Sequence, residues 1–360
     1  MGLTQAFPFQ LNDGLHARFA RGRLNLITDV PGVRVAHVNV RGRLDEPGRA
    51  LRTGVTVIIP GEGHPFRSKF AAGAHVINGF GKSIGLMQIA ELGALETPIA
   101  LTNTLAVGAG FEGVARYMLD ITPEIGETAG TVNPVVLECN DSLISDLRAM
   151  AVTADDVRRA ILLAENAGET FEEGAVGAGS GMVCYGLKGG IGSASRMVEA
   201  AGGRYTLGCL AMTNFGSMGD LVVAGRALGG AMRGALENGG GLDKGSVIIV
   251  VATDAPLSGR QLARVARRAQ SGIARTGGYT GHGSGEIALA FSTSDRIPHD
   301  STEPRAVRIM PEAGLDPFFA AMVCAVEESI LSSMEHADAA PARRGGYIMG
   351  IGGAFRAINL

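Results

Sequence analysis

Short runs of apolar, β-branched residues recur along the chain and end at glycine, proline or small polar residues. Runs of this kind are typical of strands buried on one or both faces, and the residues between them are typical of tight turns. Strands are predicted over residues 33–40, 55–60, 99–101, 134–137, 205–212, 247–253 and 287–291.

Helices are predicted over residues 84–91, 155–164, 259–273 and 317–332. In front of the second of these, Thr153 and Asp156 have the spacing of a capping box. Its buried stripe would be Val157, Ile161 and Ala164. The strands cluster in runs and do not alternate strictly with helices. This order favours an α+β fold, with sheets faced by helices, over a doubly wound parallel sheet.

The 360 residues can bury a large core, and the clearest linker lies at residues 236–244. Apolar residues make up 46% and charged residues 19% of the chain, which predicts a compact protein and favours further burial in an oligomer. The net charge is −3 and no basic stripe occurs, so nucleic acid is not an expected partner. The densest basic cluster, Arg260, Arg264, Arg267 and Arg268, has the spacing of one solvated helix face.

The four cysteines (139, 184, 209 and 324) are far apart and form no CxxC pair, which argues against disulfides and a zinc site. Together with the scattered histidines, this pattern favours a reducing, cytoplasmic compartment and no metal. The N-terminus does not resemble a signal peptide, and no apolar run is expected to reach membrane-spanning length.

The most informative motif is Gly245-Ser246, which lies directly before the strand predicted over 247–253. Glycine before the serine allows backbone conformations closed to other residues, so the hydroxyl can approach the preceding carbonyl. Attack there would convert the peptide into an ester that water can hydrolyse. Ser246 would then carry both a hydroxyl and a free α-amine, whose pKa of about 7.7–8.0 suits a general base. The alternative is a polar residue that simply begins a strand.

A second polar segment is GHGSGE at residues 281–286, which precedes the strand predicted over 287–291. In an extended chain Ser284 and Glu286 would point to the same side, where the carboxylate could orient the hydroxyl and hold a proton. The alternative is a glycine-rich turn with a solvated glutamate, in which His282 is incidental.

A third segment places Asn214 after the strand predicted over 205–212. An amide at the end of a strand can donate a hydrogen bond to a developing oxyanion. The sequence Asn-x-Gly at this place is also consistent with an ordinary turn.

A rival nucleophile is Ser83, in the GKSIG sequence at residues 81–85, which matches the nucleophile elbow of α/β-hydrolases. Its triad would need a downstream histidine, and His282, His299 and His336 are the candidates. The phosphate-binding loop that Gly-Lys-Ser also suggests fails, because its first glycine would fall at Val76.

Several ordered blocks together carry a resemblance: NLITDVPGVRV at 25–35, ETPIALTNT at 96–104, GMVCYGLKGGIG at 181–192, GS at 245–246 and ATDAPL at 252–257. Over nearly its whole length the chain resembles the self-processing serine aminopeptidases, typified by L-aminopeptidase D-esterase/amidase and the β-aminopeptidases. The resemblance implies one catalytic domain, residues 1–360, folded as an αββα sandwich similar to the N-terminal nucleophile hydrolases but with a different strand connectivity. It also implies cleavage into an α-chain, 1–245, and a β-chain, 246–360, which stay associated in a homo-oligomer of αβ units.

The resemblance further implies roles for individual residues. Ser246 matches the nucleophile, and Ser284 and Glu286 match the pair that assists it. Asn214 matches the oxyanion-hole asparagine, and Glu138 matches the acidic residue of the pocket that receives a free amine. Asn140 stands where members of the family can carry a tyrosine that helps the oxyanion. The Ser83 segment matches no functional site.

The implied reaction releases N-terminal amino acids from small peptides, amides or esters through an acyl-enzyme on Ser246, without metal or organic cofactor. One alternative is an acyltransferase of the ornithine acetyltransferase type, although those enzymes use threonine as the nucleophile. Another is an unprocessed, non-catalytic homologue. The choice among L-α-, D- and β-amino acid substrates stays open.

Overall fold

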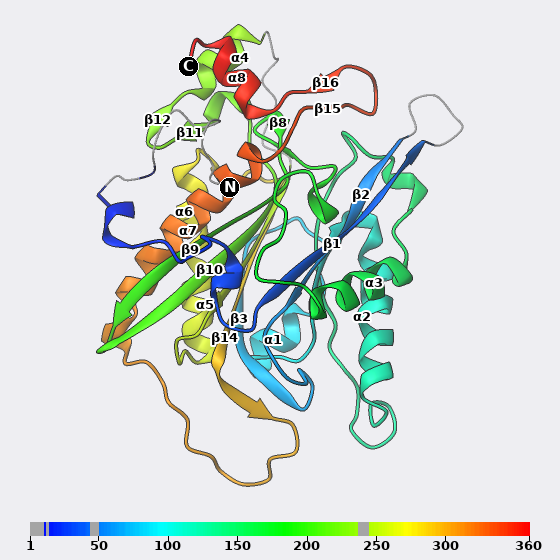
Figure 1. Ribbon diagram of the computed structural model, residues 1–360, viewed down its shortest axis with the longest axis vertical. Coiled ribbons are helices and arrows are strands. Elements are labelled where there is room, and N and C mark those ends of the chain that lie inside the picture. The colour runs from blue at the N-terminus through cyan, green and yellow to red at the C-terminus, as the bar shows by residue number, and fades with distance from the viewer. Residues whose placement is uncertain (1–10, 12–13, 44–49, 237–244) are drawn as a thin grey trace.

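The computed structural model describes residues 11, 14–43, 50–236 and 245–360, and its two large sheets stack face to face between layers of helices (Figure 1). The four-stranded sheet has the order β1-β2-β5-β6: β1 Arg34–Arg43, β2 Ala50–Ile59, β5 Ile99–Asn103 and β6 Val135–Cys139. The six-stranded sheet has the order β4-β3-β14-β13-β10-β9: β4 Ala94–Leu95, β3 Ser68–Gly79, β14 Gly285–Pro298, β13 Ser246–Thr253, β10 Gly203–Asn214 and β9 Ile191–Ala200. Neighbouring strands are antiparallel except β5 with β6 and β13 with β14.

The alternation of side chains along β13 divides the core into layers. Ile248, Val250 and Ala252 pack between the two sheets, whereas Val247, Ile249 and Val251 pack against helices. These helices are α5 (Gly259–Arg267), α6 (Ala269–Arg275) and α7 (Asp316–Glu335). On the outer face of the four-stranded sheet lie α2 (Val107–Ile121) and α3 (Ala154–Glu165). The predicted αββα sandwich is therefore confirmed.

Shorter elements complete the described chain. The remaining helices are α1 Leu86–Leu92, α4 Gly229–Ala235 and α8 Ile351–Ala357. Three small hairpins pair β7 Val183–Cys184 with β8 Leu187–Lys188, β11 Val222–Val223 with β12 Arg226–Ala227, and β15 Ala340–Pro341 with β16 Tyr347–Ile348.

Every predicted strand is present, and most are longer than their apolar runs. The capping box of α3 is confirmed: Thr153 accepts a hydrogen bond from Asp156 N, and the Asp156 carboxylate accepts one from Thr153 N. The helix predicted over 259–273 is in fact two helices, α5 and α6, which meet at Arg268. Of the predicted linker 236–244, only Leu236 lies among the described residues.

The prediction missed several elements, of which the longest are β3, β9 and the 15-residue helix α2. Glycine disfavours helices, and α2 contains Gly108, Gly110 and Gly113. A Cβ at Gly110 would lie 2.6 Å from Val136 Cγ1, and one at Gly113 would lie 2.5 Å from Val157 Cβ. The glycines therefore allow α2 to pack closely against β6 and α3, a tertiary benefit that the local pattern does not reveal.

The stretch Glu312–Glu335, which contains α7, is long and apolar enough to cross a bilayer. The expectation that no apolar run reaches that length is therefore wrong on length and composition. However, 78% of its apolar window is buried inside the protein, mostly against β9 and β10. We interpret α7 as the central core helix of this layer.

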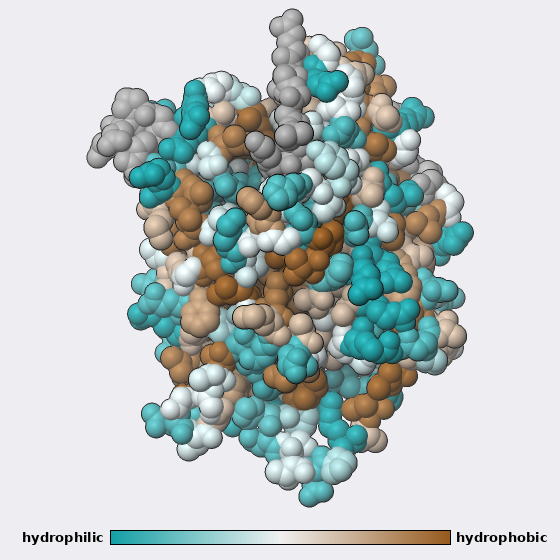
Figure 2. All heavy atoms as spheres, turned by 180° about the vertical axis from the view of Figure 1, so that it is seen from behind, coloured by the Kyte–Doolittle hydropathy of each residue, from teal (hydrophilic) through white to brown (hydrophobic). Residues whose placement is uncertain are grey.

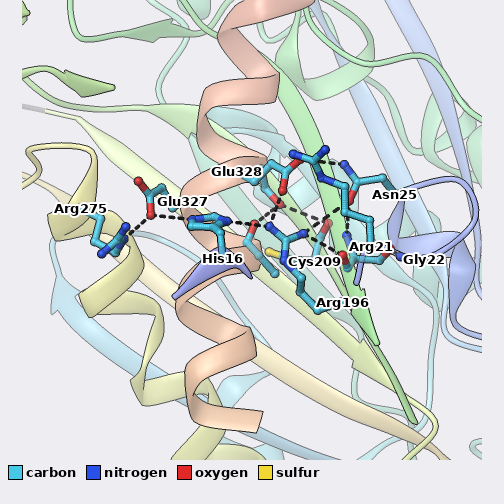
Figure 3. A network of polar contacts seen from close by, with 12 residues as sticks. His16, Arg21, Gly22, Asn25, Arg196, Cys209, Arg275, Glu327 and Glu328 are labelled. Carbon is cyan, nitrogen blue, oxygen red and sulfur yellow. Dashed lines mark hydrogen bonds and ion pairs between the residues drawn. The ribbon is translucent and has the colours of Figure 1, made fainter. Parts of the chain in front are cut away.

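A network of buried charges joins α7 to the N-terminal segment and to β9 (Figure 3). Arg196 of β9 pairs with Glu328 of α7 and contacts the His16 ring at 3.0 Å. The other ring nitrogen of His16 lies 3.0 Å from Glu327, which also pairs with Arg275. His16 thus fixes the described N-terminal segment to the core through polar contacts with residues far away in the chain.

The basic cluster does lie on one helical stretch, but it is only partly solvated. Arg260 and Arg264 both pair with Glu312. The Arg268 guanidinium lies 3.8 Å from the ring centroid of Phe319 on α7. These contacts give the cluster structural partners.

Candidate active site

Ser246 is the first residue of β13 and lies in the middle of the six-stranded sheet. It is directly opposite Asn214, the last residue of β10, and opposite Gly285, the first residue of β14. Alternation places its side chain with Ile248 and Val250, on the face toward the four-stranded sheet. Only 6% of Ser246 is exposed. The serine is thus held by strands on both sides at the end of a rigid core strand.

The backbone around Gly245 leaves no room for a side chain. A Cβ there would lie 2.0 Å from the carbonyl oxygen of Asn214 and 2.8 Å from Phe215 Cα. Its own carbonyl oxygen accepts a hydrogen bond from Gly285 N at 2.8 Å. The Gly245–Ser246 peptide is therefore fixed, and one backbone N–H already polarises its carbonyl.

Asn214 is nearly buried, and its side-chain amide is oriented by one hydrogen bond. Its Oδ1 accepts from Val183 N at 3.0 Å. Its Nδ2 makes no hydrogen bond within the described residues. Because Asn214 lies opposite Ser246, this donor is available to an oxyanion beside the serine.

Ser284 and Glu286 lie together, as their spacing predicts. The Ser284 hydroxyl donates to Glu286 Oε1 at 2.9 Å, and Thr280 Oγ1 donates to Glu286 Oε2 at 2.7 Å. Ser284 and Glu286 are fully buried. Glu286 alternates with Ala288 and Ala290, which pack on the helix side, so the pair lies on the opposite face of the sheet from the Ser246 hydroxyl.

Glu138 in β6 is buried, with 3% exposed, and is held by neutral donors. Lys82 N donates to its Oε1 at 2.7 Å, and the Thr104 hydroxyl donates to its Oε2. Among the residues that the structure describes, no cationic side chain pairs with this carboxylate. The backbone of Gly81, beside Glu138, lies against Gly285, the strand neighbour of Ser246. A buried carboxylate without a cationic partner among the described residues is thus placed close to the strand that begins at Ser246.

Asn140, two residues beyond Glu138, is exposed at the end of β6. Its Oδ1 accepts from Ser142 N at 2.9 Å, as in an Asx turn. The side-chain oxygen of Asn140 is thus engaged by the backbone of the turn that follows β6.

The rival Ser83 has a supporting position. Its hydroxyl accepts from Glu138 N at 3.3 Å. Two of the downstream histidines are engaged elsewhere: His299 packs on Phe66, and His336 bonds to Ser332. His282 is exposed and lies 6.1 Å from the Phe80 ring centroid. The Ser83 hydroxyl thus holds the backbone of Glu138 in β6.

Three residues near the site escaped the sequence analysis. The Cys139 thiol, whose pKa is raised by burial, contacts the Ser246 side chain. Lys188 is fully buried, and both oxygens of the buried Asp141 lack hydrogen bonds among the described residues. Lys188 had a possible signal, since it is a lone charge within a long run of glycine and apolar residues at 181–192. No comparable signal marks Cys139 or Asp141.

No group of three or more His, Cys, Asp or Glu side chains in the described ranges could hold a metal ion.

Comparisons with known proteins agree on one family. The sequence profile of peptidase family S58 matches residues 25–348. The β-peptidyl aminopeptidase BapA of Sphingosinicella xenopeptidilytica is 39% identical over 330 residues, which cover 87% of this chain and 81% of that protein. The crystal structure of the PH0078 protein from Pyrococcus horikoshii OT3 has a TM-score of 0.86 at 48% identity and covers 92% of both chains.

A further similar structure is the L-aminopeptidase D-Ala-esterase/amidase from Ochrobactrum anthropi, described as a prototype for the serine aminopeptidases and a new variant of the Ntn hydrolase fold. Its TM-score is 0.85 at 33% identity, covering 98% of this chain and 96% of that chain.

Proposed function

Because the chain belongs to peptidase family S58 and is an aminopeptidase, we propose that it cuts its own Gly245–Ser246 bond and then uses Ser246 as an N-terminal nucleophile. The observation that carries this proposal is the position of Ser246 at the start of β13, opposite Asn214 and Gly285. The products of cleavage would be residues 1–245 and 246–360, held together by the shared sheet.

In self-cleavage the Ser246 Oγ attacks the carbonyl carbon of Gly245. The carbonyl oxygen becomes an oxyanion that Gly285 N–H, already 2.8 Å away, can stabilise. The C–N bond then breaks as the nitrogen takes up a proton, which leaves an ester. Water hydrolyses this ester to a Gly245 carboxylate, a Ser246 hydroxyl and a free Ser246 α-amine.

In catalysis the same Oγ attacks the carbonyl carbon of an N-terminal residue in a small peptide, amide or ester. The Ser246 α-amine takes the hydroxyl proton and passes it to the leaving group, and water hydrolyses the acyl-enzyme. Asn214 Nδ2 stabilises the oxyanion. Because Ser284 and Glu286 lie across the sheet from the hydroxyl, they act on the α-amine at the strand end, where they hold its proton and orientation.

Glu138 binds the free amine of the substrate. Its carboxylate is buried and accepts hydrogen bonds from Lys82 N and Thr104, but no cationic side chain among the described residues pairs with it. A substrate ammonium can therefore form an ion pair with it. Asn140 can contact the same substrate, since it directly follows the strand that carries Glu138.

Its cellular setting and assembly are also part of this proposal. The four cysteines are buried and unpaired, which supports a reducing, cytoplasmic compartment. Exposed apolar side chains such as Phe80 (55%), Met87 (89%) and Leu92 (61%) support a homo-oligomer of αβ units. Figure 2 shows hydrophobic side chains gathered in the middle of one face. Acyl transfer to an amine and an unprocessed binding role have no specific observation in their favour.

The test is the intact mass of the denatured protein, measured for the wild type, Ser246→Ala and Ser83→Ala. We expect two fragments that meet at Gly245/Ser246 in the wild type and in Ser83→Ala, and one uncut chain without aminoacyl p-nitroanilide hydrolysis in Ser246→Ala. An uncut wild type, or an active Ser246→Ala, would overturn the proposal. Loss of cleavage in Ser83→Ala would favour the rival serine.

A further inference from the structure

Lys188 is a cation in the interior of the protein, close to the candidate site. It is 0% exposed, and its Nζ donates to three backbone carbonyl oxygens: Gly179 O at 3.1 Å, Met182 O at 2.9 Å and Gly189 O at 2.5 Å. No acidic side chain in the described chain pairs with it. Burial lowers the pKa of Lys188 to about 7. A charge buried at such a cost needs a reason beyond packing.

The three carbonyls belong to one loop, residues 179–189, which includes the β7–β8 hairpin. Lys188 lies at the end of this hairpin, and its side chain extends back to Gly179 at the beginning of the loop. Its ammonium therefore links the two ends of the loop, which backbone hydrogen bonds also connect. One such bond is Gly189 N to Met182 O at 3.0 Å. Without the ammonium, Gly179 O and Met182 O would each keep one backbone donor, Met182 N at 3.2 Å and Gly189 N at 3.0 Å, but no single group would join them to Gly189 O.

This loop is attached to the strand end that carries Asn214. Thr213 N donates to Gly190 O at 3.0 Å, and Tyr185 N donates to Phe215 O at 2.7 Å. Between these two contacts, Val183 N donates to Asn214 Oδ1 at 3.0 Å. Val183 directly follows Met182, whose carbonyl oxygen Lys188 holds.

We propose that Lys188 is a positioning residue for the oxyanion hole, because its ammonium fixes the loop whose Val183 N–H orients the Asn214 amide. An amide group is planar, so fixing Oδ1 also fixes the direction of Nδ2. Lys188 acts through Asn214 and does not touch the substrate. This inference rests on the proposed function, in which Asn214 donates to the oxyanion.

The first experiment is a double-mutant cycle on aminoacyl p-nitroanilide hydrolysis with Lys188→Met, Asn214→Ala and the combination, with kcat expressed per cleaved chain. Loss of one oxyanion donor lowers kcat by roughly 10²–10³-fold. For Lys188→Met we expect kcat to fall at least 10-fold with KM within about threefold. In the Asn214→Ala background, the same change should cost nothing further.

Arg196→Met is the matched control, since Arg196 is also a fully buried cation, but it pairs with Glu328 and lies opposite Leu207, seven residues along β10 from Asn214. Its kcat should stay within about threefold of the wild type even though its stability falls. An unchanged kcat in Lys188→Met, or an equal loss in both Asn214 backgrounds, would overturn the positioning role. Should Lys188→Met not fold, Lys188→Gln, which keeps two donors without charge, takes its place in the cycle under the same criteria.

A crystal structure of Lys188→Met in the Ser246→Ala background separates this inference from the proposed function, because it needs neither cleavage nor activity. We expect the hydrogen bond from Val183 N to Asn214 Oδ1 to be lost. Its retention at 3.0 Å would overturn the inference. An active Ser246→Ala would overturn the proposed function while leaving this structural result interpretable.

Discussion

Two groups of buried charged side chains, one around α7 and one at the candidate site, differ in the partners that surround their charges. In the network around α7, carboxylates meet cations: Glu328 pairs with Arg196 and Arg21, and Glu327 pairs with Arg275 and lies beside His16 (Figure 3). At the candidate site, Glu138 is held by neutral donors, Lys188 by carbonyl oxygens, and Asp141 by no hydrogen bond within the described chain.

The two regions differ in whether their buried charges are paired, and this difference affects stability. The α7 network is closed, because its charges neutralise one another and connect segments far apart in sequence. At the candidate site the charged groups are not paired with one another, which lowers stability but, in the function that we propose, leaves Glu138 available to a substrate amine. Removing a charge should therefore lower stability in the first region and raise stability or alter kinetics in the second.

The largest effect is expected for Arg196→Met. It leaves the buried Glu328 without its closest cation, and breaking a buried ion pair costs about 3–5 kcal/mol. Urea unfolding followed by circular dichroism measures the loss. The exposed pair of Arg158 and Asp120 supplies the control, because Arg158→Met should cost about 1 kcal/mol or less. Equal losses in the two variants would remove the distinction between a closed network and a surface pair.

Asp141→Asn should raise the free energy of unfolding, whereas Arg196→Met lowers it. Burial raises the pKa of Asp141 from 3.8 to about 6, so the folded state disfavours the ionised carboxylate. The unfolded carboxyl ionises near pH 3.8, so the wild type loses stability as the pH rises from about 4 to 6. That rise in pKa corresponds to about 3 kcal/mol. At pH 7.5 the neutral asparagine should therefore gain about 2–3 kcal/mol, and the gain should shrink toward pH 4.

Urea unfolding at pH 7.5 and pH 5 tests this expectation. The control is Asp29→Asn, because Asp29 accepts hydrogen bonds from Leu24 N, Leu26 N and the Ser195 hydroxyl. That change should lower stability. A loss of stability in Asp141→Asn at pH 7.5 would mean that the Asp141 carboxylate is satisfied in a way that the contacts do not reveal.

The smallest effect in free energy is expected for Glu138→Gln. Glutamine preserves the shape and the acceptor for Lys82 N, but it removes the charge that would meet a substrate ammonium. Charge-assisted hydrogen bonds contribute about 1.5–3 kcal/mol, so KM for free-amine substrates should rise about 10- to 100-fold. This rise in KM is measured by steady-state kinetics on an aminoacyl ester and on its N-acetylated counterpart. An equal change in KM for both esters would show that Glu138 does not bind the free amine of the substrate.

Much of the candidate site could be predicted because its signals are local. The apolar run after Ser246, the need for glycine at position 245, and the two-residue spacing of Ser284 and Glu286 depend only on strand geometry and on neighbours in the chain. The structure agrees at each of these places: β13 begins at Ser246, a Cβ at Gly245 would meet Asn214 O at 2.0 Å, and Ser284 bonds Glu286. The role of each side chain, by contrast, came from the resemblance to a family.

The sequence by itself determined seven of the ten strands in the two large sheets and the helical segments at α1, α3, α5–α6 and α7, since alternation and capping act over a few residues. Only the tertiary structure decided that the glycine-containing segment 107–121 is a helix, because its stability comes from close packing on Val136 and Val157. The tertiary structure alone also decided that Lys188 is enclosed by carbonyls and that the Asp141 carboxylate is buried beside Thr53 without a cationic partner in the described chain. Burial and pairing are sums of contacts between distant residues, so no local pattern encodes them.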